Sequence, residues 1–324
     1  MSALPTRPDA PTEQARGSRV RRRSLLTGLL ATPLAAVAGP AQAEEAPRVA
    51  VARRPRRKPR EVTLYAADLP DGAGWGFGLE PGEPTVPGPT LEMVEGETLR
   101  VTVVNQATTT VSLHVHGVDY DIDSDGTPMN GGTVAPGAER TYVWRSHAPH
   151  RRRDRTWASG SAGYWHYHDH SVGSDHGTMG VQKGLYGALV VRRPGDPLPD
   201  QQIVCVFADV IVNGMPAGQA PTFHSRLGDR VEWIMITHGE LFHTFHLHGH
   251  RWADNRTGLV QDARDESRLL DTRVTGPADS FGFQVIAGER VGPGAWMYHC
   301  HVQHHSDFGM AGHWHIADEG HPHH

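Results

Sequence analysis

Residues 88–105 read GPTLEMVEGETLRVTVVN, and residues 220–237 read APTFHSRLGDRVEWIMIT. Both stretches have a Pro near the start, a Gly-containing turn in the middle and a final run rich in β-branched or aromatic residues, which favours strands. Similar runs predict further strands, and no stretch sustains the apolar period of a helix. These runs are ERTYVWR (139–145), ALVVRR (188–193) and QIVCVFADV (202–210). The sequence therefore predicts an all-β protein that contains one unit twice.

The duplication continues beyond the opening stretch. His114 precedes His166 by 52 residues, and His246 precedes His299 by 53 residues. The matching segments are SLHVHGV (112–118) with TFHLHGH (244–250), and AGYWHYHDH (162–170) with GAWMYHCHVQHH (294–305). A Pro-rich polar linker, RRPGDPLPD (192–200), separates the copies. Two domains are expected, 61–192 and 200–318, each of a size that suits a Greek-key β-sandwich.

The termini differ in character from the two repeats. Residues 1–43 combine an arginine-rich start, a short apolar stretch and the small-residue end Ala41-Gln42-Ala43, as in a secretory signal. The pair Arg22-Arg23 resembles a twin-arginine signal, with an ordinary secretory signal as the alternative. We therefore expect export from the cell. Residues 44–60 predict a basic disordered arm, and residues 319–324 form a His-rich tail.

Composition excludes several classes of protein. The chain has 324 residues with 2 Cys, too few for a disulfide scaffold. Its mean hydropathy of −0.46 and the lack of an apolar run near 20 residues argue against an integral membrane protein. Residues 61–324 carry 18 basic and 32 acidic residues, a net charge near −14. We therefore expect neither nucleic acid nor an anionic membrane as a partner.

Histidine is abundant, with 23 residues, and all of them lie at or after position 114. Four His-x-His pairs stand at matched spacing in the two repeats: His114/His116, His166/His168, His246/His248 and His299/His301. In a strand, residues i and i+2 point to the same face, so each pair can offer two imidazoles to one cavity. Eight imidazoles in a shared space suit Cu, Zn, Fe or Ni.

The segment HCHVQHHSDFGM (299–310) selects copper among these metals. Cys300 lies inside the fourth His pair, and His305 and Met310 follow at intervals of five residues. Together with His243, they supply two imidazoles, a thiolate and a thioether, the ligand set of a blue-copper electron-transfer site. The first repeat has Val111, Tyr167, Val172 and Gly177 at the corresponding positions. One blue-copper site is therefore predicted, in the second domain.

Four motifs resemble the copper motifs of multicopper oxidases: HVHG, HYHDH, HTFHLHGH and HCHVQHHSDFGM. The resemblance covers residues 61–318. The layout resembles that of the two-domain (small) bacterial laccases, which implies two cupredoxin-like domains. By the family pattern, type 1 copper is bound by His243, Cys300, His305 and axial Met310. Type 2 copper is bound by His114 and His246, and the type 3 pair by His116, His166, His168, His248, His299 and His301. The resemblance implies four coppers per chain.

The resemblance also implies an activity and an assembly. Type 1 copper would take single electrons from phenols or aromatic amines, and O2 would be reduced to water at the cluster of type 2 and type 3 coppers. The family's ring is a homotrimer, with each cluster between domain 1 of one subunit and domain 2 of the next. Asp125 is a candidate carboxylate near the cluster, or part of a solvated acidic loop. Tyr120 is a candidate electron relay near type 2 copper, or a packed tyrosine.

Two enzymes are rivals to a laccase. Copper nitrite reductase is also a two-domain trimer, but it lacks a type 3 pair and carries type 1 copper in its first domain. A metal-ion oxidase acting on Cu(I) or Fe(II) often has Met-rich segments, whereas the 8 Met here are scattered. A non-catalytic copper carrier would not need eight extra imidazoles at matched spacing. A laccase-like oxidase is therefore the predicted function.

Overall fold

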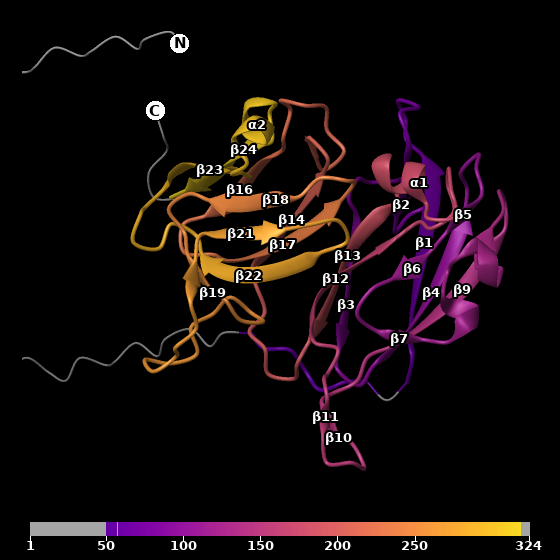
Figure 1. Ribbon diagram of the computed structural model, residues 1–324, viewed down its shortest axis with the longest axis horizontal. Helices are drawn as coiled ribbons and strands as arrows, with labels where there is room; N and C mark the ends of the chain where they lie inside the picture. Colours follow the sequence, from indigo (N-terminus) through magenta and orange to yellow (C-terminus); the bar gives the residue numbers. More distant parts are fainter. Residues whose placement is uncertain (1–49, 57, 319–324) are drawn as a thin grey trace, which may run out of the picture. The chain divides into compact units, whose positions relative to one another are not determined.

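The structure is a computed structural model, and it describes residues 50–56 and 58–318. The predicted all-β class is confirmed (Figure 1), since the few helices are single turns of three to five residues. The strands up to the linker are β1 (Arg60–Asp68), β2 (Trp75–Gly78), β3 (Gly88–Val94), β4 (Thr98–Asn105), β5 (Val111–Ser112), β6 (His114–Val115), β7 (Asp119–Tyr120), β8 (Thr133–Val134), β9 (Glu139–Arg145), β10 (His150–Arg151), β11 (Trp157–Ala158), β12 (Gly163–His168) and β13 (Tyr186–Arg192).

The second half of the chain repeats this strand-rich pattern. Its strands are β14 (Gln201–Ala208), β15 (Ile211–Val212), β16 (Thr222–Arg226), β17 (Arg230–His238), β18 (His243–Leu247), β19 (Trp252–Ala253), β20 (Leu269–Leu270), β21 (Thr272–Thr275), β22 (Ser280–Ile286), β23 (Gly294–Cys300) and β24 (Ala311–Ala317). The helices are the 3-10 turns η1 (Ile122–Ser124) and η2 (Pro128–Asn130), and α1 (Thr178–Gln182) and α2 (Gln303–Asp307).

Each half of the described chain forms a sandwich of two sheets. In the first half, the sheet β2-β1-β4-β9-β7 faces the sheet β3-β13-β12-β6 across a core that includes Leu99 and Trp144. In the second half, β15-β14-β17-β22 faces β16-β24-β23-β18-β21 across a core that includes Trp233 and Trp314. The parallel pair of β3 with β13 recurs as the parallel pair of β16 with β24. The internal repeat therefore has a matching topology in both halves.

A third apolar cluster joins the two sandwiches. It contains Tyr164, Tyr186 and Ala188 from the first half, and Val206 and Ile234 from the second. Because apolar side chains from both sides are removed from water, this contact holds the sandwiches together. It also fixes β12, which carries two of the expected copper ligands, against the second sandwich.

A buried ion pair crosses the same contact. The Arg192 guanidinium donates to both carboxylate oxygens of Glu232, at 2.9 and 2.7 Å, and Tyr164 Oη donates to Glu232 at 2.8 Å. Burial alone would raise the pKa of Glu232, but the hydrogen bonds and charge of Arg192 outweigh it and hold that pKa below its usual value. A buried charge of this kind requires its partner, so removing either residue would destabilise the contact between β13 and β17.

The expected basic arm lies partly within the described residues. Ala52 N donates to Asp196 O at 2.8 Å, and Leu198 N donates to Ala50 O at 2.7 Å. This part of the segment 44–60 therefore lies along the linker, which differs from the expected disorder because the linker's backbone groups accept and donate these bonds. The expected signal, 1–43, and the His-rich tail, 319–324, lie outside the described residues and stay predictions. None of the helices in the described part has the length and apolar character needed to cross a membrane.

Candidate copper centres

The first group of metal-ligating side chains is buried in the second sandwich. Cys300 ends β23, His243 begins β18 and His305 lies on α2. The Cys300 Sγ lies 3.6 Å from Nδ1 of His243 and 3.5 Å from Nδ1 of His305. All three residues are buried, and burial followed by the nearby His305 lowers the pKa of His243 to about 4. Both imidazoles thus turn the same nitrogen toward one sulfur.

Met310 is held beside this group by the backbone. Cys300 N donates to Met310 O, and Met310 N donates to His305 O, both at 3.0 Å. The Met310 side chain is fully buried. The segment from 300 to 310 therefore closes on itself, which explains why three expected ligands so close in sequence can serve one site.

The first sandwich has no such group at the corresponding place. Val111, Tyr167 and Val172 are buried members of its apolar core. Gly177 occurs where the second repeat has Met310, and its φ of 65° lies in the left-handed region that favours glycine. The described chain thus has one group of two imidazoles and a thiol, in its second half, as the sequence predicts.

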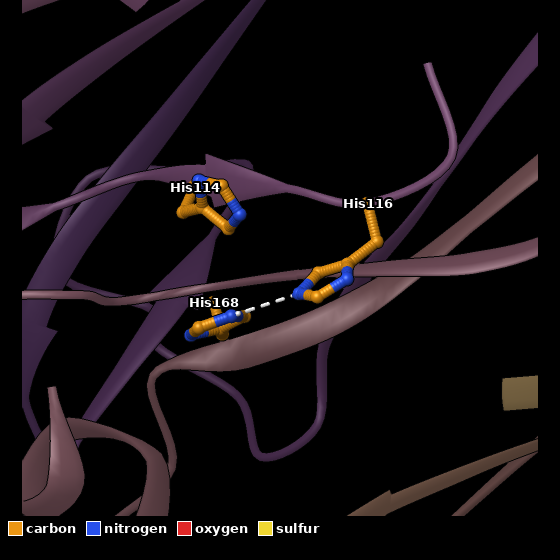
Figure 2. Close-up of side chains that lie close together, drawn as sticks. All are labelled: His114, His116 and His168. Carbon is orange, nitrogen blue, oxygen red and sulfur yellow. Dashed lines mark hydrogen bonds between the residues drawn. The ribbon is translucent and has the colours of Figure 1, made fainter. Parts of the chain in front are cut away.

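A second group lies at the end of the sheet that contains β6 and β12 (Figure 2). His114 is the register partner of His168, and Nε2 of His116 lies 3.1 Å from Nε2 of His168. His166 stacks on His116 with ring centroids 4.0 Å apart. Because metal–nitrogen bonds are about 2.0–2.1 Å long, two nitrogens roughly 3 Å apart can bind one ion.

A third group repeats this arrangement in the second sandwich. His246 on β18 is the register partner of His299 on β23. Nε2 of His248 lies 3.2 Å from Nε2 of His299, which matches the spacing in the second group. The His301 ring lies 5.3 Å from His246 and 5.2 Å from His299, centroid to centroid. Each sandwich therefore gathers four imidazoles from two His-x-His pairs.

Hydrogen bonds at Nδ1 orient most of these rings. His114 Nδ1 lies 2.7 Å from Asp125 O, and His168 Nδ1 lies 2.7 Å from Asp169 O. The equivalent contact joins His246 Nδ1 to Asp271 O at 2.8 Å. A backbone carbonyl can only accept, so each Nδ1 carries the proton and leaves Nε2 with its lone pair. The rings are thereby prepared to bind metal through Nε2.

Burial keeps several of these imidazoles neutral. Desolvation, followed by the neighbouring His114 and His170, lowers the pKa of His116 to about 4. Desolvation likewise holds the pKa of His166 and that of His168 well below the usual value. Since a metal binds the neutral form, these residues need not lose a proton to bind metal at neutral pH. In addition, Nε2 of His166 is buried without a hydrogen-bond partner among the described residues.

The two four-imidazole groups differ in their exposure. His166 and His168 are buried, whereas His246 and His299 are partly exposed and His301 is exposed. Within the described part of the chain, no hydrogen bond or ring contact links the group of the first sandwich to that of the second. Within one chain, the imidazole nitrogens of the first sandwich therefore do not contact those of the second.

Asp125 and Tyr120 both lie beside His114. Asp125 Oδ1 is 3.8 Å from His114 Nδ1, and the other carboxylate oxygen, Oδ2, accepts hydrogen bonds from Thr127 Oγ1 at 2.5 Å and Asn130 Nδ2 at 2.8 Å. Burial would raise the pKa of Asp125, but these hydrogen bonds outweigh it and lower that pKa. The Tyr120 ring centroid is 5.7 Å from that of His114. Asp125 and Tyr120 therefore both lie beside the second group, and Asp125 is ionised at neutral pH.

Two further histidines, His170 and His238, lie beside the second group, although neither belongs to an expected ligand set. The His170 ring lies 5.2 Å from His114, and the extended motif His166-x-His168-x-His170 could have indicated it. The His238 ring, at the end of β17, lies 5.0 Å from that of His166. No local pattern signals His238, because it reaches the group only through the contact between the sandwiches.

The chain matches known proteins over nearly all of its described length. Two multicopper oxidase family models match it, one over residues 83–196 and the other over residues 196–320. A probable nitrite reductase–hydroxylamine oxidoreductase fusion protein of Kuenenia stuttgartiensis is 33% identical over 262 residues, which are 74% of this chain and 28% of that protein. Ceruloplasmin of Homo sapiens is 26% identical over 266 residues, which are 69% of this chain and 23% of that protein. The chain thus spans about a quarter of the length of these relatives.

Solved structures agree on the fold. A crystal structure of a multicopper oxidase aligns with a TM-score of 0.59 at 24% identity, covering 84% of this chain and 94% of that one. A copper nitrite reductase from Nitrosomonas europaea aligns with a TM-score of 0.58 at 18% identity, covering 81% and 95%. Sandwiches of this kind, with these family matches, define a copper-binding oxidoreductase with cupredoxin-like domains. The chain belongs to the multicopper oxidase family, as a small two-domain member.

The residues present fit the copper that the family implies. The buried sulfur of Cys300 faces two imidazole nitrogens, the donor set that suits a type 1 site. The paired Nε2 atoms of the other two groups have the spacing of nitrogens that share an ion. The chemistry and burial of these donors thus agree with copper.

Proposed function

We propose that this protein is a laccase-like oxidase, which removes single electrons from small phenols or aromatic amines and passes them to O2. The observation that carries the proposal is the position of Cys300. Its side chain lies in the buried group with His243 and His305, while its chain neighbours His299 and His301 lie beside His246. A short covalent path thus links an electron-accepting site to a second set of imidazoles. A simple copper carrier would not need this second set.

The proposed ligand sets follow the three groups. His243, Cys300, His305 and Met310 would hold type 1 copper, and His114 and His246 type 2 copper. The type 3 pair would be held by His116, His166, His168, His248, His299 and His301. When bound, copper supplies the one-electron chemistry and the reduction of O2 to water. The chain's part is to keep the imidazoles neutral, fix their Nδ1 protons and bury Cys300.

The surroundings of the type 1 group support an aromatic donor. His305 is 9% exposed, more than any of the other three proposed ligands of type 1 copper. Phe242, next to His243 in sequence, is 69% exposed, and Phe308, three residues after His305, is 55% exposed. Exposed aromatic side chains of this size are suited to contact a flat apolar ring. A small aromatic reductant is therefore the proposed substrate class.

The exposure of the third group supports a homotrimer. His301 is exposed, and His246, His248 and His299 are not fully buried, although their role as ligands would require partners on the open side. We propose that the second group of a neighbouring subunit completes the site, in a head-to-tail contact that closes into a ring. Export through the sequence 1–43 belongs to the same proposal, since an oxidase of external aromatics acts outside the cell.

Copper counting with spectroscopy tests the proposed function. We expect four coppers per chain, a blue thiolate band and O2 consumption that depends on an added phenol. The similarity to nitrite reductases makes that activity the specific alternative. Two coppers per chain, no type 3 signal and nitrite-dependent turnover would replace the laccase proposal with the reductase.

Replacing Asp125 tests its proposed role in moving protons at the cluster. Asp125→Asn keeps an oxygen for the bonds from Thr127 and Asn130 but removes the charge near His114. We expect phenol-dependent O2 consumption to fall by about 10²–10⁴-fold, the usual loss of a general acid or base, with a changed pH profile. Asp123→Asn is the matched control, because Asp123 is an exposed neighbour with the same charge. A normal rate and pH profile for Asp125→Asn would assign it a purely structural role.

A further inference from the structure

Three histidines outside the copper groups share one face of an outer sheet. His313 and His315 alternate on β24 with the buried residues Trp314 and Ile316. His224 lies on β16, which is parallel to β24, and its register partner is His315. All three histidines are exposed. Because side chains alternate across a strand, the three imidazoles stand on the solvent face of the sheet.

One pair of these rings has the spacing of expected copper ligands. The ring centroids of His224 and His315 are 5.3 Å apart, and those of His313 and His315 are 6.2 Å apart. The His248 and His299 rings also have centroids 5.3 Å apart, and their Nε2 atoms approach to 3.2 Å. Exposed side chains can rotate about their χ angles, so His313 can close the larger gap.

The ring nitrogens of this cluster are available. Over residues 50–56 and 58–318, no hydrogen bond is made to the ring nitrogens of His224, His313 or His315. His224 is fixed through its backbone instead, because Gln201 Nε2 donates to His224 O at 2.8 Å. The strands are thus held in place while the imidazoles remain open to a ligand.

The charge beside His224 favours a cation. Asp200 and Asp229 line an open depression of about 660 Å³ next to it, against the single positive charge of Arg226. The Asp229 carboxylate accepts a hydrogen bond from Arg226 N at 3.1 Å, and that of Asp200 accepts one from Arg230 N at 2.8 Å. Two fixed carboxylates raise the local concentration of cations.

We propose that His224, His313 and His315 form a surface site for one divalent transition-metal ion of the class that imidazole prefers. A His-x-His pair on one strand and a third His on the neighbouring strand offer three nitrogens to a tetrahedral ion, and water fills the fourth position. Cu²⁺ binds such a site more tightly than Zn²⁺. The site is separate from the three copper groups and does not depend on the proposed oxidase activity.

Titration of the copper-loaded, full-length protein with Zn²⁺ tests this site. We expect one Zn²⁺ per chain by calorimetry and by metal counting after gel filtration, with the resident copper count unchanged. His224→Ala and His315→Ala should each weaken binding at least about tenfold, since the loss of even an outer partner of a ligand costs that much. Both side chains are exposed, so thermal unfolding should stay unchanged in these variants.

Two control variants make the result specific. His150→Ala removes an exposed imidazole from another pair, whose rings are 5.8 Å apart, and should leave Zn²⁺ binding intact. Replacing the three histidines of 319–324 by alanine should also leave it intact. Absence of an additional Zn²⁺ in the native protein, unchanged binding in His224→Ala and His315→Ala, or loss of binding with the tail histidines would each overturn the proposal.

Discussion

Cys300→Ser is expected to abolish the blue absorption and to lower phenol oxidation by on the order of 10⁴-fold, the scale of loss for a group that the chemistry requires. The Cys300 Sγ is the sulfur that lies between the Nδ1 atoms of His243 and His305. A serine hydroxyl has a similar shape but cannot supply a soft thiolate, so the site would lose both its colour and its route for electrons. Absorption spectroscopy, copper counting and stopped-flow oxidation of a phenol measure these effects.

Cys205→Ser is the matched control for this experiment. Cys205 is the second free thiol, it is fully buried on β14, and burial raises its pKa well above the usual value. Its replacement leaves a hydroxyl in an apolar core, which costs about 1–3 kcal/mol of stability if it lacks a partner. The blue band and the oxidation rate should nevertheless remain. Retained blue colour in Cys300→Ser would refute the type 1 assignment.

Two inactive variants are expected to restore activity when they are produced together in one cell. His116→Ala disables the group of the first sandwich, and His248→Ala disables that of the second. In a ring where each cluster joins neighbouring subunits, a mixed trimer contains one interface with both groups intact. Random assembly of equal amounts should give about a quarter of the native activity per chain. Oxygen consumption and light scattering measure the activity and the trimer.

Variants that damage the same group supply the control. His116→Ala together with His168→Ala should show no recovery, because every interface then lacks a ligand in the first sandwich. Mixed trimers of His116→Ala and His248→Ala without activity would place the cluster within a single chain. The exposure of His301 and the incomplete burial of His246 and His248 argue for the shared arrangement.

The strands could be predicted with little error, and the His-x-His pairs can be read directly from the sequence as candidate metal ligands. The run TLRVTVVN coincides with β4, ERTYVWR with β9, and RVEWIMIT with β17, which extends one residue further. In β4 buried and partly exposed residues alternate, so the local sequence contains both the strand and the face on which each side chain lies, whereas β17 is a short run that is buried on both faces. The contacts of Ala50 and Ala52 with the linker could not be predicted, because they involve backbone groups that no side-chain pattern encodes.

By itself, the sequence determined the all-β class, the duplication and the candidate metal-ligating residues, because each depends on short periods and on side-chain chemistry. Only the tertiary structure decided which side chains from distant segments come into contact. It placed His238 beside His166, paired Arg192 with Glu232 across the sandwiches, and aligned His224 with His315. It also left His166 and His168 buried and His301 exposed. These outcomes depend on the packing of segments far apart in the chain, and packing is a property of the whole fold.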